Sequence, residues 1–264
     1  GEEWRRGWPP EVVPPRKHEK EILVVGAGPA GLECARTLGQ RGYAVCVNYA
    51  HSKDAAEQVV ARIAGAGGKA IAVQADVSQP AEAKRLFDET DRRLGKVDAL
   101  VNNAGIIGRQ CRLDELDDAV LAQVFAVNTF SYFYCAREAL RRMSTKHGGK
   151  GGAILNISSA AARHGGLPME SHYAASKGAV DSFTVGLAKE VGKEGVRVNA
   201  IRPGLIVTDI HQAHGGDATI RSVGPTVPLG REGFPMEIAE AAVWLCSDAA
   251  SYVHGAILDV SGGR

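Results

Sequence analysis

Three side chains in the second half of the sequence have the types needed for proton transfer to or from an oxygen atom. Tyr173 and Lys177 stand at positions i and i+4 of a segment with helical spacing, which places them on one helical face. An ammonium group beside a phenol stabilises the phenolate and lowers its pKa from about 10 toward the range in which acid–base catalysts work. Ser159 follows an apolar run upstream, where its hydroxyl could polarise a substrate carbonyl. The pattern predicts an acid–base site for carbonyl or alcohol groups.

These residues also have an ordinary structural interpretation. Tyr173 and Lys177 could form a surface pair, because a single motif match has a real false-positive rate. The joint presence of an acid–base group, a group that orients it and a hydrogen-bond donor favours catalysis over that alternative.

A glycine-rich turn between an apolar run and a helical segment is typical of dinucleotide binding. Gly26, Gly28 and Gly31 form the pattern GxGxxG directly after residues 22–25. In that setting the first glycine permits a tight turn, the second lets the backbone approach a pyrophosphate, and the third allows close helix packing. The alternative is a glycine turn without a ligand, which the strand-then-helix context disfavours.

The residues at the end of the second apolar run bear on which dinucleotide is bound. A site for NAD carries an acidic residue about 20 positions after the glycine turn, where it holds the ribose 2′-hydroxyl. Here the first acid is Asp54. The three residues before it, His51, Ser52 and Lys53, could hold a 2′-phosphate instead. We therefore expect a preference for NADP, with NAD as the alternative if these residues are only a solvated turn.

Seven short apolar runs alternate with segments of helical spacing. The expected strands are 22–25, 44–47, 70–73, 99–101, 153–157, 196–201 and 256–260. The expected helices include 55–64, 79–94, 116–143, 173–191 and 235–247. This alternation predicts an α/β fold with a single doubly wound, Rossmann-type parallel sheet of about seven strands and helices on both faces. Ligands of such sheets bind beyond the carboxyl ends of the strands, where the glycine turn and Ser159 lie.

Length and composition exclude several classes of protein. The 264 residues suffice for one large domain, which we place at residues 21–264 after an extended, proline-rich tail at 1–20. A net charge of +1 argues against nucleic-acid binding, which needs a basic face. Five widely spaced cysteines without a CxxC pair predict reduced thiols and a cytoplasmic location. The N-terminal residues lack the apolar region of a secretory signal.

Two other segments have weaker patterns. Residues 119–136 carry no charged side chain and are long enough to suggest a membrane span. Asn128 and other polar residues interrupt them, so we expect a buried helix and no membrane. Asp209, His211 and His214 resemble metal ligands, yet three close donors on a loop are more often part of a mobile lid. No metal is expected.

Several motifs, in consistent order, resemble the short-chain dehydrogenase/reductase family from about Tyr43 to the C-terminus. The resemblance implies a catalytic role for Asn128, Ser159, Tyr173 and Lys177. Tyr173 would transfer the proton, and Lys177 would lower its pKa and hold the nicotinamide ribose. Ser159 would bind the substrate carbonyl oxygen, and Asn128 would support a water-linked proton path from the lysine.

The resemblance also implies cofactor contacts beyond the glycine turn. They fall in an adenine-contacting stretch, an NNAG motif and a loop after the sixth expected strand, and comprise Asp76, Val77, Asn103, Ala104, Gly105, Pro203, Gly204, Ile206 and Thr208, besides Tyr173 and Lys177. It suggests a homo-oligomer, a tetramer or dimer, in which helices 116–143 and 173–191 pair between subunits. The substrate would be a small molecule with a carbonyl or secondary alcohol, and its identity and the reaction direction stay open.

The first 44 residues depart from that family. The family's first loop reads TGxxxGxG, whereas this chain has the shorter GxGxxG pattern, with Val25 in place of the threonine. Residues 26–33 are similar instead to the GxGPAGLE fingerprint of flavoproteins related to trimethylamine dehydrogenase and dienoyl reductase, and residues 2–8 resemble the linker before it. We therefore hypothesise a chimera joined near Tyr43, whose shorter loop could shift the pyrophosphate and weaken activity.

Three functions follow, in order of preference. The first is an NADP-preferring oxidoreductase that transfers hydride between a nicotinamide and a carbonyl or secondary alcohol. The second is a catalytically impaired chimeric Rossmann protein that binds a nucleotide weakly or serves as a scaffold. The third is a flavin site at the ADP-binding turn, which the complete set of motifs after Tyr43 disfavours.

Overall fold

The apolar runs form the strands of one parallel sheet in the computed structural model, which describes residues 20–208 and 222–264. The strands are β1 (Glu21–Val25), β2 (Ala44–Tyr49), β3 (Ala70–Gln74), β4 (Ala99–Asn102), β5 (Gly152–Ile157), β6 (Val196–Pro203) and β7 (Ile257–Val260). Their order in the sheet is β3-β2-β1-β4-β5-β6-β7, and every pairing is parallel. The predicted seven-stranded parallel sheet is confirmed.

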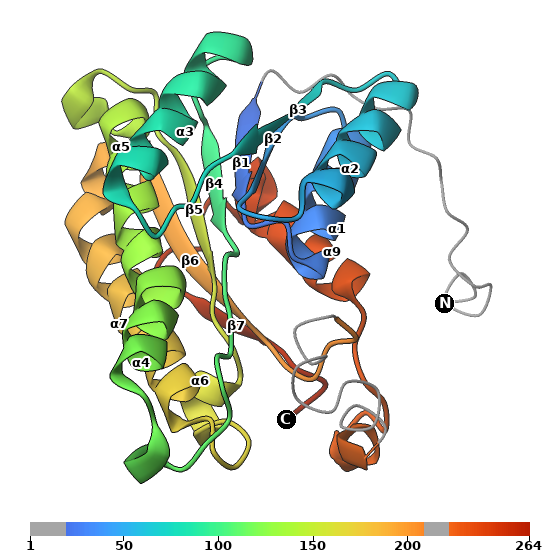
Figure 1. The fold of residues 1–264 in the computed structure, drawn as a ribbon. Coiled ribbons are helices and arrows are strands. Elements are labelled where there is room, and N and C mark those ends of the chain that lie inside the picture. Colours follow the sequence, from blue (N-terminus) through green and yellow to red (C-terminus); the bar gives the residue numbers. More distant parts are fainter. Residues whose placement is uncertain (1–19, 209–221) are drawn as a thin grey trace.

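Helices cover both faces of this sheet (Figure 1). One layer holds α1 (Pro29–Gln40), α2 (Lys53–Gly65) and α9 (Pro235–Cys246). The other holds α3 (Pro80–Arg93), α4 (Asp118–Phe125), α5 (Ser131–Met143) and α7 (Ser171–Val191), with the short α6 (Ala161–His164) near α7. Single 3₁₀ turns occupy Leu113–Glu115, Thr145–His147, Gly192–Glu194, Gly224–Thr226 and Asp248–Ala250.

Strand β1 shows why such runs are apolar throughout. Its side chains alternate between two separate cores: Ile22 and Val24 pack in the core beneath α1 and α9, whereas Leu23 and Val25 pack in the core beneath α3 and α5. A strand that is buried on both faces has no solvent-facing position. Its sequence is therefore a continuous apolar run rather than an alternation of apolar and polar residues.

The expected helix 116–143 is a composite of three parts. Asp117 caps the N-terminus of α4 by accepting a hydrogen bond from the Ala119 amide (2.7 Å), so the helix begins two residues later than expected. A π-helical turn at Ala126–Phe130 then joins α4 to α5. The run Asp118–Met143 is long and apolar enough to cross a membrane by length and composition alone, since an 18-residue window in it has a mean hydropathy of 1.3. Here α5 packs on the sheet and against α3.

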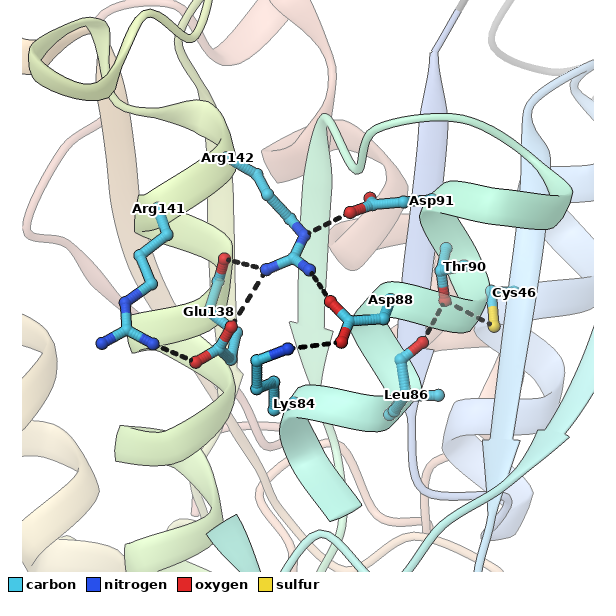
Figure 2. A network of polar contacts seen from close by, with 9 residues as sticks. All are labelled: Cys46, Lys84, Leu86, Asp88, Thr90, Asp91, Glu138, Arg141 and Arg142. Atoms are coloured by element: carbon cyan, nitrogen blue, oxygen red, sulfur yellow. Dashed lines mark hydrogen bonds and ion pairs between the residues drawn. The ribbon is translucent and has the colours of Figure 1, made fainter. Parts of the chain in front are cut away.

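A polar cluster links α3 to α5 at the end of the helix layer, near the start of β1 (Figure 2). Arg142 is bound by Asp88, Asp91 and Glu138, with N–O distances of 2.7, 2.7 and 3.0 Å. Its guanidinium also lies 5.1 Å from the centre of the Phe87 ring. The cluster fixes one helix pair far from the carboxyl ends of the strands.

The chain reverses its direction of strand addition between β1 and β4. Strands β2 and β3 are added on one side of β1, and β4 begins the addition on the other side. This topological switch leaves a crevice beyond the carboxyl ends of β1 and β4, where ligands of open α/β sheets bind. The Asn103 amide donates to the Val25 carbonyl (2.9 Å), which closes the two loops against each other at the floor of that crevice.

Two predictions concern residues outside the described ranges. Most of the expected tail 1–20 and all of the expected loop donors Asp209, His211 and His214 fall there. Within residues 20–208 and 222–264, no group of three or more metal-ligating side chains gathers. The five cysteines all lie within the described part, and each is buried with a free thiol.

Candidate active site

A cavity of about 690 Å³ opens at the carboxyl ends of β1, β4, β5 and β6. Eleven of the residues that the sequence analysis selected line it: Gly28, Ser52, Asn103, Gly105, Ser159, Tyr173, Lys177, Pro203, Gly204, Ile206 and Thr208. They come from six separate loops or helices, so only the topology of the sheet brings them together. These eleven residues, predicted from separate motifs, therefore border a single space.

Tyr173 and Ser159 face each other across the start of α7 and the loop after β5. Burial raises the pKa of the Tyr173 phenol, and the side-chain hydrogen bond with Ser159 lowers it in part. The Ser159 oxygen also accepts from the Ala161 amide (3.1 Å), which fixes the hydroxyl at the first turn of α6. The expected lowering of this pKa by Lys177 does not occur in this structure, because burial and the nearby Glu170 raise the pKa and only Ser159 lowers it.

Lys177 is buried next to acceptors that carry no charge. Its Nζ donates to the Ile157 carbonyl (2.8 Å) and to the Tyr132 hydroxyl (3.2 Å). Burial lowers the pKa of the amine to about 7. Asp181, one turn further along α7, raises it only in part, and its carboxylate is already paired with Arg202 at 2.8 Å. At neutral pH this amine can therefore hold or release a proton.

Asn128 holds the loop after β4 and does not line the cavity. Its Oδ1 accepts from the Ile106 amide and its Nδ2 donates to the Ile106 carbonyl, both at 2.8 Å. The same Nδ2 donates to the Ser176 hydroxyl (3.0 Å) on α7. A side chain at Gly105 would approach both Lys177 and Asn128, with its Cβ 3.3 Å from the Lys177 Nζ. Asn128 thus positions the loop that borders the amine.

The three glycines of the turn have two distinct tasks. A Cβ at Gly26 would lie 2.6 Å from the Ala104 amide nitrogen, and its φ of +97° also favours glycine. A Cβ at Gly31 would lie 2.2 Å from the Gly26 carbonyl oxygen and 2.5 Å from the Asn103 side chain. Gly28 differs, since the nearest atom to its Cβ would be 3.9 Å away. Gly26 and Gly31 serve packing, and Gly28 leaves space at the N-terminus of α1.

The predicted adenosine side of the site is only partly gathered. Ser52 lines the cavity, whereas His51 and Lys53 are exposed beside it, and Lys53 lies 3.8 Å from the Glu57 carboxylate. After β3, Asp76 is exposed and accepts from the Ser78 amide, and Val77 is buried. These last two residues, like Ala104, do not line the cavity.

The loop after β6 closes the opposite side. Pro203, Gly204, Ile206 and Thr208 all line the cavity. Backbone hydrogen bonds of 2.9 Å between this loop and Gly233 form a short ladder just before α9, which holds the loop in place. The predicted contacts on this side therefore stand on a fixed backbone up to the end of the described range.

Sequence reasoning missed one buried polar group at the centre of the site. Tyr132 is 1% exposed, and its hydroxyl contacts Lys177. It lies one helical turn after Asn128, but an aromatic residue in an apolar helix gives no sign of its hydroxyl's partner. Glu170 was also missed: it is buried at the cavity wall, and it accepts from Gln110 (2.6 Å) and from the Leu167 amide (3.1 Å).

Comparison with known proteins agrees with this geometry. A family model described as Enoyl-(Acyl carrier protein) reductase matches residues 28–264, which is most of the chain. The chain belongs to the short-chain dehydrogenase/reductase family. The match begins before Tyr43, so the family likeness extends further toward the N-terminus than the sequence motifs indicated.

Individual members of the family are similar over nearly their whole length. The oxidoreductase YgfF of Escherichia coli (strain K12) is 44% identical over 92% of this chain and 98% of the relative. Versicolorin reductase 1 of Aspergillus parasiticus is 40% identical over 92% and 95%. A 7α-hydroxysteroid dehydrogenase, solved with NADH and 7-oxo glycochenodeoxycholic acid, has a TM-score of 0.86 and 35% identity, with coverage of 95% and 96%. The chain thus shares fold and sequence with oxidoreductases of this family.

Proposed function

We propose that this chain is an NADP-preferring oxidoreductase that transfers hydride between a nicotinamide and the carbonyl or secondary alcohol of a small molecule. The observation that carries the proposal is that Tyr173, Ser159 and Lys177 share one cavity with the N-terminus of α1. A helix N-terminus attracts phosphate, and the three side chains provide a proton donor, a carbonyl-binding hydroxyl and an amine.

The cavity has the features that a nicotinamide dinucleotide needs. No acidic residue lies in the first turn of α1, and Gly28 leaves open space where a pyrophosphate would meet the helix. Ile206 and Thr208 would border the nicotinamide, and Lys177 would hold its ribose. When bound, the cofactor supplies or accepts the hydride. A solved relative that contains NADH supports this assignment.

The chain's own residues would handle the proton. The raised pKa of Tyr173 keeps the phenol protonated at neutral pH, so that its Oη can donate to a carbonyl oxygen. The Ser159 hydroxyl would orient that oxygen and stabilise the phenolate that remains. Lys177, with a pKa of about 7, would return a proton to the site. Because a protonated phenol is a donor, these properties favour reduction of a carbonyl.

The experiment that tests the proposal is an assay of NADPH and NADH oxidation with a panel of carbonyl compounds. The panel should run from small aldehydes to polycyclic ketones, because versicolorin reductase 1 and a hydroxysteroid dehydrogenase are among the relatives. We expect turnover that Tyr173→Phe lowers by about 10²–10⁴-fold while dinucleotide binding persists. Unchanged turnover in Tyr173→Phe would refute the catalytic assignment. Binding without turnover by the wild type would favour the scaffold alternative.

The preference for NADP rests on the charge beside Ser52. Lys53 and His51 are exposed next to the cavity, where a 2′-phosphate would meet them. We expect Lys53→Glu to lower the ratio of NADPH to NADH affinity by about tenfold, the size of one charge-assisted contact. Lys146→Glu, an exposed lysine between α5 and β5, serves as the control. Equal affinity of the wild type for both dinucleotides would refute the preference.

We also propose a homo-oligomer in the cytoplasm. Phe130 and Phe133 are 48% and 46% exposed on the helix layer, and Phe133 stacks on Phe183 of α7 at 3.9 Å between ring centres. An exposed aromatic patch of this kind is suited to pairing between subunits. Light scattering that gives the mass of a monomer would refute the oligomer. The five free thiols support a reducing compartment.

The chimera stays a proposal that rests on the fingerprint at residues 26–33. If the shorter loop seats a pyrophosphate poorly, a variant with residues 25–31 rebuilt to the family's TGxxxGxG pattern should bind NADPH more tightly and turn over faster. Equal or weaker binding by that variant would mean that the present loop is already adapted. Because the family match begins at residue 28, it includes α1.

A further inference from the structure

A second tyrosine occupies the buried side of the site. The Tyr132 hydroxyl lies 3.2 Å from the Lys177 Nζ, 2.9 Å from the Ile157 carbonyl oxygen and 3.1 Å from the Ala104 carbonyl oxygen. Ile157 ends β5, and Ala104 belongs to the loop after β4. The hydroxyl thus ties the amine to the carboxyl ends of two neighbouring strands.

The directions of these hydrogen bonds are determined by the groups involved. Carbonyl oxygens only accept, so the single hydroxyl proton of Tyr132 points to Ile157 or Ala104. The hydroxyl oxygen is then left to accept from Lys177. The same amine donates to Ile157 at 2.8 Å. Two of its hydrogen atoms are therefore directed away from the cavity, and the third is free for the side bordered by Gly105, where a Cβ would lie 3.3 Å from Nζ.

We propose that Tyr132 is a positioning residue that holds Lys177 in place and supplies one of the two acceptors of its charged form. The role in the reaction rests on the proposed function of Lys177, whereas the contact itself does not. The amine lies 5.1 Å from the centre of the phenol ring, beyond the ring edge that carries the hydroxyl, so the hydroxyl oxygen is the group that favours the cation.

The charged surroundings of the amine make the effect measurable. Asp181 of α7 contributes at longer range and is paired with Arg202. From α5 the titratable neighbour is Tyr132, which in turn interacts with Tyr173. Strand β5 contributes the Ile157 carbonyl, and the π-helical turn contributes the neutral amide of Asn128, which holds the neighbouring loop. Removing the Tyr132 hydroxyl should therefore lower the pKa of Lys177 further below its ordinary value.

The test is a pH titration of the protein without cofactor, labelled with ¹³C in the lysine side chains, in which Lys177→Met identifies the signal. In Tyr132→Phe we expect the midpoint of Lys177 to fall by about one pH unit, the size of a lost hydrogen bond to a charged group. Tyr134→Phe is the matched control, because it removes the same kind of hydroxyl two residues further along α5, where Tyr134 packs against the core beneath α3 and α5. Equal midpoints in all three proteins would overturn the proposal.

A second measurement does not depend on the folding of a variant. In the wild type, magnetisation transfer between the Lys177 side chain and the Tyr132 ring should be strong, and its absence would also overturn the proposal. Activity is then read separately: we expect the pH above which the rate declines to move down in Tyr132→Phe and to stay in Tyr134→Phe. A chain that binds no dinucleotide and reduces no carbonyl would refute the proposed function and leave the titration result standing.

Discussion

Two cations that are largely removed from solvent in this protein have opposite kinds of partner. Arg142, between α3 and α5, is surrounded by three carboxylates, and although burial lowers its pKa, the hydrogen bonds to Asp91 and Glu138 raise it overall (Figure 2). Lys177, at the carboxyl ends of β4 and β5, meets a carbonyl and a phenol, and burial lowers its pKa to about 7.

The difference separates a structural cluster from the site for which we propose a function. An arginine keeps its proton at any ordinary pH, and with several carboxylate partners it fixes two helices. The Lys177 amine, with neutral hydrogen-bond acceptors, bears a desolvation cost that Asp181 offsets only in part, and its proton becomes exchangeable near neutral pH. A charged partner thus favours rigidity in one region, and neutral acceptors favour the proposed proton transfer in the other.

The largest expected effect concerns the functional region. Lys177→Met should lower turnover by about 10²–10⁴-fold, because the amine that orients and reprotonates the site is gone. Thermal stability at pH 7 should not fall in parallel, since the removed cation has no charged partner. Steady-state kinetics and thermal melts of the same preparation measure both. A large loss of melting temperature with unchanged kcat would reverse the assignment of this region.

The next effect concerns the structural region. Arg142→Met should destabilise the fold by about 1–3 kcal/mol, because Asp91 loses its ion pair and the buried Glu138 keeps only its pair with Arg141. The kcat per folded molecule should stay close to that of the wild type, since the cluster is remote from the cavity. Urea unfolding followed by fluorescence measures the stability. A variant as stable as the wild type would show that the network adds little to the free energy of unfolding.

The pH dependence of stability should also differ. The pKa of Lys177 is about 7 in the folded chain and near its ordinary value of 10.5 when unfolded. Between these values the unfolded chain binds more protons, so this residue's contribution to stability rises with pH, by up to about 1.4 kcal/mol per pH unit. The difference in unfolding free energy between wild type and Lys177→Met should show that slope from pH 7 to 10. A flat difference would mean that the amine titrates normally.

The smallest effect provides the matched control for the cluster. Arg141 lies next to Arg142 but is 56% exposed and makes one ion pair, with Glu138 at 2.6 Å. Arg141→Met should therefore change the unfolding free energy by only about 0–1 kcal/mol. Urea unfolding compares it directly with Arg142→Met. A loss of unfolding free energy as large as that of Arg142→Met would mean that the stabilisation comes from net charge rather than from the buried ion pairs.

Most of the fold followed from local patterns. Every expected strand appears within a few residues of its expected bounds, because a strand buried on both faces is a continuous apolar run between turns. The helix expected at 116–143 shows the limit of that reasoning. The spacing of apolar residues does not predict the π-helical turn around Asn128. Hydrogen bonds between the Asn128 side chain and Ile106 and Ser176, which are distant in sequence, accompany that turn.

The sequence by itself determined the parallel sheet, the glycine turn and the identities of Ser159, Tyr173 and Lys177, because periodicity and motif spacing are local properties. Only the tertiary structure decided that Lys177 of α7 meets Tyr132 of α5 beside the carboxyl ends of β4 and β5. It also decided that the pKa of Tyr173 is raised by burial rather than lowered. Both depend on desolvation and on contacts between residues far apart in sequence, which no local pattern contains.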